Sequence, residues 1–289
     1  MAGTADHPTQ LAPSASIEQV AAHPKRVALA CIIVLAALGW LYLGVLVAGM
    51  QGASGIDRAL IDALCRPGFG RAASGLSFAL NVALVFSMWC AMVLAMMLPT
   101  AGPMVATYAE LADTAARKGE HAVSPLVLTA GYGVVWLGFA LAATALQIAL
   151  TRAALLDPAM ASASPLFSGA ILLGAGLYQF SALKEACVKR CQRPFPFFFA
   201  NWSSKPRDIF RLGLMQGVYC LGCCWAMMMV MFAVGLMNVL WMAVLGMVMT
   251  AEKLATTMQI SRVVGVVLIV IGIVFMATAI AAHWPMRSL

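Results

Sequence analysis

The sequence predicts an all-α protein, a polytopic bundle of about seven transmembrane helices. Of its 289 residues, 63% are hydrophobic and only 10% are charged. Several apolar runs reach roughly 20 residues, the length at which an α-helix crosses the hydrocarbon core of a bilayer. The connections between these runs are short. We therefore expect a single transmembrane bundle over residues 27–289 and no separate soluble domain.

The amino-terminal segment, residues 1–26, differs from the rest in composition. It is rich in Ala, Pro, Ser and Thr and has no apolar periodicity, which is typical of a disordered tail. The first span, Val27 to Ala48, directly follows Lys25 and Arg26. It is longer than the hydrophobic part of a secretory signal, so we expect a retained signal anchor with the amino terminus and its tail in the cytoplasm.

Six further apolar segments follow, and Pro99 and Pro103 are expected to end or kink the first of them because proline lacks a backbone donor. The segment after Asn238 is short, since the charged pair Glu252 and Lys253 follows it closely. Six spans with a re-entrant segment at that point are the alternative. The predicted spans cover residues 76–99, 125–150, 166–184, 212–235, 239–250 and 263–282.

The distribution of basic residues predicts the orientation of the chain. Lys and Arg are concentrated between the fourth and fifth spans, at Lys184, Lys189, Arg190, Arg193, Lys205, Arg207 and Arg211. Loops rich in these residues stay in the cytoplasm, so we expect a multi-pass protein of the bacterial cytoplasmic membrane. The net charge of +7 then reflects loops near lipid headgroups. The expected partners are the lipid bilayer and, as an open alternative, other membrane subunits, with no nucleic acid.

Five of the eight cysteines form two groups at the cytoplasmic ends of predicted spans. Cys187 and Cys191 are four residues apart, and Cys220, Cys223 and Cys224 follow the spacing i, i+3 and i+4, so each group lies on one helix face. Thiolates prefer soft ions, Cu(I) first and Zn(II) second. These five residues are therefore the predicted ligands of a soft metal ion at the cytoplasmic face of the membrane.

Two other interpretations of the cysteines stay open. Cys220 and Cys223 form a CxxC pair, so the protein is alternatively a thiol–disulfide oxidoreductase with Cys187 or Cys191 as exchange partner. The thiols alternatively pack as small apolar groups, in a structural or assembly subunit of a membrane complex. No P-loop and no Ser-His-Asp arrangement is present, so we identify no catalytic residue and favour a protein that is not an enzyme.

Small residues predict close helix contacts on two spans. Gly213 and Gly217 form a GxxxG motif on the fifth span, and Ala170 with Gly174 has the same spacing on the fourth. Such pairs let two helix backbones approach each other. We expect a neighbouring helix against each of these faces.

Several polar residues lie near the predicted helix ends. Gln179, Lys184, Glu185, Glu252 and Lys253 are expected to extend toward water. Lys184 also stands one turn before Cys187, where a cation favours the thiolate. Glu252 is alternatively the partner of Lys184.

Four strings together resemble a family of predicted metal-binding integral membrane proteins of unknown function. They are "AMMLPTAGPM" at 95–104, "GYGVVW" at 131–136, "YQFSALKEACVKRCQRPF" at 178–195 and "GVYCLGCCWAMMMVMFAVGLMNVLWM" at 217–242, the last followed by Glu252 and Lys253. The resemblance covers residues 75–255. It implies that the five clustered cysteines occupy the family's cysteine positions, and that its polar positions are Tyr178, Gln179, Lys184, Asn238, Glu252 and Lys253.

These observations converge on one hypothesis. The protein holds a soft ion, Cu(I) before Zn(II), in a cysteine cluster at the cytoplasmic membrane face. It either moves the ion across the membrane or delivers it to a membrane partner. In that case Cys220, Cys223 and Cys224 are the core ligands, and Cys187 and Cys191 complete the site.

Overall fold

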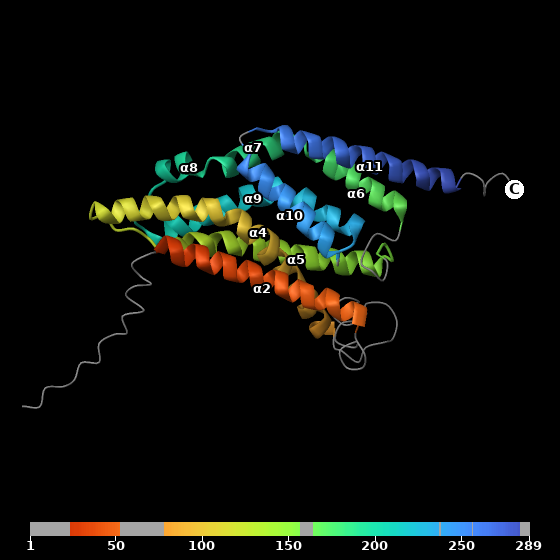
Figure 1. Ribbon diagram of the computed structural model, residues 1–289, viewed down its shortest axis with the longest axis horizontal. Coiled ribbons are helices and arrows are strands. Elements are labelled where there is room, and N and C mark those ends of the chain that lie inside the picture. Colours follow the sequence, from red (N-terminus) through yellow and green to blue (C-terminus); the bar gives the residue numbers. More distant parts are fainter. Residues whose placement is uncertain (1–23, 53–77, 157–163, 237, 256, 284–289) are drawn as a thin grey trace, which may run out of the picture.

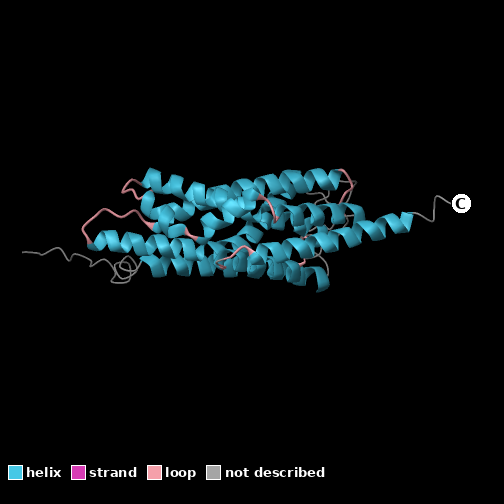
Figure 2. Ribbon diagram, turned by 90° about the horizontal axis from the view of Figure 1, so that it is seen from above, coloured by secondary structure: helices cyan, strands magenta, loops and turns pink. Residues whose placement is uncertain are grey.

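The computed structural model describes residues 24–52, 78–156, 164–236, 238–255 and 257–283. Within these ranges the chain is helical, which confirms the all-α prediction for this part of the protein. The helices run lengthwise in an elongated bundle (Figures 1 and 2). They are α2 (Pro24–Gly52), α4 (Phe78–Arg117), α5 (Pro125–Arg152), α6 (Pro165–Tyr178), α7 (Ala182–Gln192), α8 (Pro194–Ala200), α9 (Pro206–Val234), α10 (Val239–Leu254) and α11 (Gln259–His283). Most of the predicted tail, residues 1–23, lies outside the described ranges.

Five of these helices, α2, α4, α5, α9 and α11, are long and apolar enough to cross a membrane by length and composition. The pair α6 and α7 meets the same test together, which raises the number to six. Helix α10 has 16 residues, so at 1.5 Å per residue it is shorter than the roughly 30 Å of a hydrocarbon core. The predicted count of seven spans is therefore not confirmed.

Helix α4 continues past Pro99, where the second span was expected to end. It runs 40 residues, through Pro99 and Pro103, as far as Arg117. Pro99 leaves the carbonyl of Ala95 without its usual helical partner. The indole nitrogen of Trp40, on α2, donates a hydrogen bond to this oxygen at 2.9 Å. A side chain from a neighbouring helix thus satisfies the acceptor that the proline frees.

The fourth predicted span is interrupted before its cysteines. Helix α6 ends at Tyr178, and α7 begins at Ala182 with a bend of 63° between them. The side chain of Ser181 caps α7 by accepting a hydrogen bond from the backbone nitrogen of Lys184 at 3.1 Å, as a serine at an N-cap does. The expectation of one helix through residues 166–184 is therefore wrong. The bend turns α7 toward α9 and α10, which it contacts.

The predicted close contact at Gly213 and Gly217 is confirmed. A methyl group on Gly213 would lie 2.1 Å from the carbonyl oxygen of Leu128, and one on Gly217 would lie 2.9 Å from the side chain of Val135. Only glycine permits this approach, so α9 packs directly on the backbone of α5.

The small-residue face of α6 differs from the predicted one. A methyl group on Gly174 would meet nothing within 4 Å, whereas one on Gly169 or Gly176 would lie 2.9 Å from the carbonyl oxygen of Gly272 or Gly265, respectively. Helix α6 therefore packs on α11 through glycines of both helices, and the two lie side by side in Figure 1. The interpretation of Ala170 and Gly174 as a contact face is wrong.

Candidate metal site

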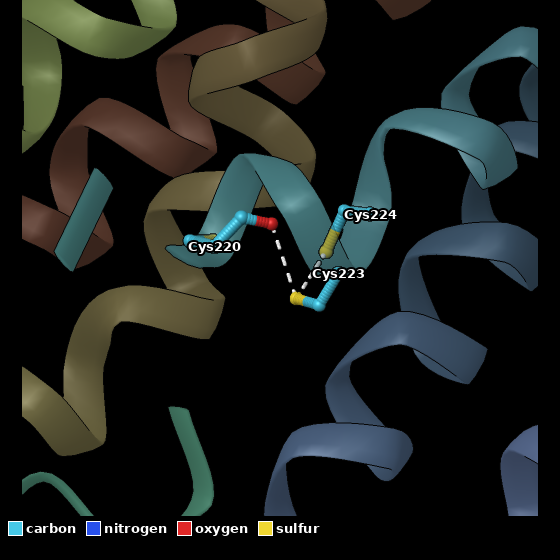
Figure 3. A group of neighbouring side chains, drawn as sticks. All are labelled: Cys220, Cys223 and Cys224. Atoms are coloured by element: carbon cyan, nitrogen blue, oxygen red, sulfur yellow. Dashed lines mark hydrogen bonds between the residues drawn. The ribbon is translucent and has the colours of Figure 1, made fainter. Parts of the chain in front are cut away.

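The three cysteines of α9 lie close together inside the bundle. Their sulfur atoms are all within 4.8 Å of one another, and all three residues are buried. The Cys223 sulfur lies 3.1 Å from the carbonyl oxygen of Cys220 and 3.2 Å from the Cys224 sulfur (Figure 3). The spacing i, i+3 and i+4 places them on one face, as expected for a helix. We call Cys220, Cys223 and Cys224 the three-sulfur group.

The two cysteines of α7 have different surroundings. Cys191 lines the same cavity as Cys220, so it lies beside the three-sulfur group on a second helix. Cys187 instead packs against the α9 backbone, where a methyl group on Gly222 would lie 2.6 Å from the Cys187 sulfur. All five residues thus lie on two helices in contact, α7 and α9, and of the α7 pair it is Cys191 that shares a cavity with Cys220. The cysteines that the structure describes are free thiols.

Lys253, near the end of α10, contacts the three-sulfur group directly. Its ammonium nitrogen donates hydrogen bonds to the Cys220 sulfur at 3.0 Å and to the Thr100 hydroxyl at 2.6 Å. An ammonium at this distance stabilises the negative thiolate form of a cysteine. The expectation that Lys253 extends to water is therefore wrong, because the residue lies at the centre of the site.

Tyr132 brings a further helix, α5, to the same sulfur. Its hydroxyl oxygen lies 3.1 Å from the Cys220 sulfur and donates a hydrogen bond to the Met97 carbonyl at 3.3 Å. Helices α4, α5, α9 and α10 thus meet around Cys220 through Thr100, Tyr132 and Lys253. Four elements distant in sequence converge on one point.

Lys184 has a different role from the one expected beside Cys187. Its ammonium pairs with the carboxylate of Glu252 at 2.7 Å, and the two side chains are 0% and 2% exposed. Glu252 is therefore the partner of Lys184, and the expectation that these residues extend to water is wrong. Gln192 of α7 also donates a hydrogen bond to the Glu252 carbonyl at 2.9 Å. The ion pair is neutral as a whole, so it joins α7 to α10 without adding charge.

Two residues of the site, Thr100 and Tyr132, were not predicted from the sequence. Both belong to the strings "AMMLPTAGPM" and "GYGVVW", which are part of the family resemblance. Their hydroxyl groups stand in apolar helices, where a buried polar group needs a partner. A hydroxyl group in an apolar helix therefore indicates a buried polar contact, but the sequence does not show which residue is the partner.

The residues present fit a soft monovalent or divalent ion. Sulfur ligands at about 2.3 Å from one ion are separated by roughly 3.5–4 Å, so sulfurs within 4.8 Å need only small shifts. Lys253 supplies one positive charge. Cu(I) with two thiolates, or Zn(II) with three, carries one negative charge, which this ammonium neutralises. Charge balance matters here because an uncompensated charge is costly inside a protein.

Comparisons with known proteins give one informative match. No curated protein and no solved structure matches the chain significantly. The sequence model of the PpoB2 family, described as a copper chaperone, matches residues 86–275. This range is well over half of the chain and contains every residue of the site described above. It confirms the resemblance to a metal-binding family, and the chain belongs to the PpoB2 copper chaperone family.

Proposed function

We propose that the protein binds Cu(I) as a cargo through Cys220, Cys223 and Cys224, with Cys191 as a further sulfur ligand, and delivers it to a partner in the membrane. The observation that carries this proposal is the buried three-sulfur group with an ammonium 3.0 Å from one sulfur. Thiolates favour Cu(I) over harder ions. The description of the family as a copper chaperone supports copper over zinc.

The four sulfurs differ in how firmly the fold holds them. Cys220 has Lys253 and Tyr132 as partners and lies on a long helix. Cys191 is half-buried at the end of α7, a helix of 11 residues. A delivery protein needs one sulfur ligand that its contacts hold in place and one that can release the ion. We assign the first role to Cys220 and the second to Cys191.

The surrounding helices support a position of this site within a bilayer. Five or six of them are suited to span a membrane, and the cysteines lie inside the bundle that these helices form. We propose that the bundle sits in the bacterial cytoplasmic membrane with its amino terminus inside, because the basic loop between α7 and α9 favours the cytoplasmic side. Delivery to a partner and passage across the membrane both use such a site, and we favour delivery because of the family description.

Metal analysis of the purified full-length protein tests the proposal. Wild type from copper-supplemented cells is expected to carry stoichiometric copper, and the double variant Cys223→Ser with Cys224→Ser is expected to carry almost none. Cys90→Ser is the matched control, because Cys90 is a half-buried thiol on α4 outside the site. It should keep the wild-type copper content.

The same preparations are checked by thermal unfolding to establish that each variant is folded. Equal and near-zero copper in all three folded proteins would remove the proposal. If wild type carries zinc in place of copper and the double variant carries neither metal, the cysteines are the metal site and the ion is zinc.

A further inference from the structure

A cavity of ≈ 130 Å³ lies beside the three-sulfur group. Cys191 and Cys220 form part of its wall, so cysteines of two helices line the same space. Pro99, Pro103 and Leu254 stand at its rim and are exposed. The remaining wall consists of Thr100, Ala101, Met104, Tyr132, Gln216, Thr250 and Lys253. The cavity thus connects Cys220 with the surface of the bundle.

The ammonium of Lys253 favours an anion beside Cys220, and the amide oxygen of Gln216 favours a hydrogen-bond donor elsewhere in the cavity. The side-chain oxygen of Gln216 is buried and has no partner among the described residues, which is costly unless a ligand donates to it. Lys253 has three donors, of which Cys220 and Thr100 take two. A ligand in the cavity would therefore meet an ammonium and an amide oxygen beside Cys220.

The size of the cavity limits the occupant to a small group. On this measure a cavity needs about 10–15 Å³ to hold one water molecule, so ≈ 130 Å³ accommodates a thiol head group and its first carbons. It is too small for a folded domain. The ligand of suitable size, charge and softness for a Cu(I) site is a thiolate.

We propose that this cavity admits the thiolate of an exchange partner, which takes Cu(I) from Cys220. The inference rests on the proposed function and names the acceptor of the cargo. Each incoming thiolate forms a bond to Cu(I) as one protein sulfur leaves, first Cys191 and last Cys220, until Cu(I) is held by the acceptor thiolates alone. Cys220 leaves as a thiolate that keeps its hydrogen bond from Lys253. Copper stays Cu(I), so no electron is transferred.

The test uses the copper-loaded full-length protein in detergent, with excess mercaptoacetate as the acceptor. Copper that remains bound is measured by rapid desalting and metal analysis at successive times. Two variants narrow the cavity: Ala101→Phe changes a buried wall residue, and Leu254→Trp changes a rim residue that is 64% exposed. Leu240→Trp is the matched control, on the same helix, 71% exposed and outside the cavity wall.

Both cavity variants are expected to carry wild-type copper but to lose it about tenfold more slowly, while Leu240→Trp behaves as wild type. Leu254→Trp keeps the test valid if Ala101→Phe does not fold, because its position is exposed. Wild-type rates in the folded cavity variants would overturn the cavity assignment and leave copper binding intact. Equal slowing in the control would overturn it as well. A wild-type protein without copper would overturn both proposals.

Two further acceptors identify the source of the thiolate. Because Lys253 favours an anion, methyl mercaptoacetate, which lacks the carboxylate charge, is expected to remove copper more slowly than mercaptoacetate at the same thiolate concentration; equal rates with both would argue against the role of Lys253. A folded protein with one exposed cysteine is the other acceptor. Transfer to it, slowed by Leu254→Trp, assigns the cavity to a protein partner, whereas transfer to mercaptoacetate alone assigns it to a free small thiol.

Discussion

The sulfur of Cys220 has two polar partners from other helices. An ammonium from α10 and a hydroxyl from α5 both lie within 3.1 Å of it, although the residue is buried in an apolar bundle. Contacts of this kind stabilise a thiolate where water is excluded. The contribution of Lys253 to the site is therefore electrostatic and can be measured separately from the ligands.

Replacing Lys253 by Met is expected to weaken copper binding while the protein stays folded. The substitution removes a hydrogen bond to a charged group, which contributes about 1.5–3 kcal/mol, equivalent to roughly 10- to 100-fold in Kd. Competition titration against a Cu(I) chelator measures the change. Lys253→Arg retains the charge and should recover part of the affinity. An unchanged affinity in Lys253→Met would show that the ammonium has no role in binding.

The buried pair Lys184 and Glu252 is predicted to contribute to folding and not to ligation. Lys184→Met or Glu252→Gln alone leaves the other partner buried without compensation, which costs about 3–5 kcal/mol. The double variant Lys184→Met with Glu252→Leu removes both charges and should be close to wild type. Unfolding in detergent compares the three proteins. Single variants as stable as wild type would contradict this role.

At the scale of the helices, α9 carries the site because it packs closely on α5. Gly213 and Gly217 allow this contact, and Tyr132 then reaches Cys220 from α5. The spacing of the cysteines and of these glycines could be predicted from the sequence, since both depend only on the periodicity of a helix.

Gly213→Ala is expected to destabilise the protein by about 1–3 kcal/mol, the usual cost of overpacking. The added methyl group would lie 2.1 Å from the Leu128 carbonyl oxygen, so α5 and α9 would have to separate. Gly174→Ala is the control, because a methyl group there meets nothing within 4 Å. Thermal unfolding measures both. Equal melting temperatures for the two variants would contradict the close α5–α9 contact.

The direction of α7 could not be predicted in the same way. The break between Tyr178 and Ala182 depends on contacts between helices as well as on Ser181, since the hydroxyl of Tyr178 donates a hydrogen bond to the Gly222 carbonyl on α9. The continuation of α4 through Pro99 likewise depends on Trp40 of another helix. Local patterns predict helices, but partners from other helices decide where they end.

At the scale of the whole molecule, the irregular parts of the bundle gather at the site. Helix α10 ends just beyond Lys253, and α7 ends just beyond Cys191. Interrupted helices inside a membrane are tolerated where they are buried in protein or line a cavity. Helix α10, which length and composition do not identify as a span, is one of these short elements at the site.

The packing of α6 on α11 predicts the position of the carboxyl terminus. The contacts of Gly169 with Gly272 and of Gly176 with Gly265 make the two helices antiparallel. Because α6 runs toward the basic α7–α9 loop, α11 runs away from it, and the start of α2 and the end of α11 lie at opposite ends of the bundle in Figure 1. With that loop in the cytoplasm, a carboxyl-terminal alkaline phosphatase fusion should be active and a green fluorescent protein fusion dark. The reverse pattern would contradict this topology.

X-ray absorption spectroscopy of the copper-loaded wild-type protein tests the central claim most directly, because it reports both the oxidation state and the ligand atoms. The predicted result is Cu(I) with sulfur as the only ligand element, and loss of this signal in the double variant Cys223→Ser with Cys224→Ser. Copper bound mainly by nitrogen or oxygen, or an unchanged spectrum in the double variant, would contradict the assignment of the three-sulfur group as the copper site.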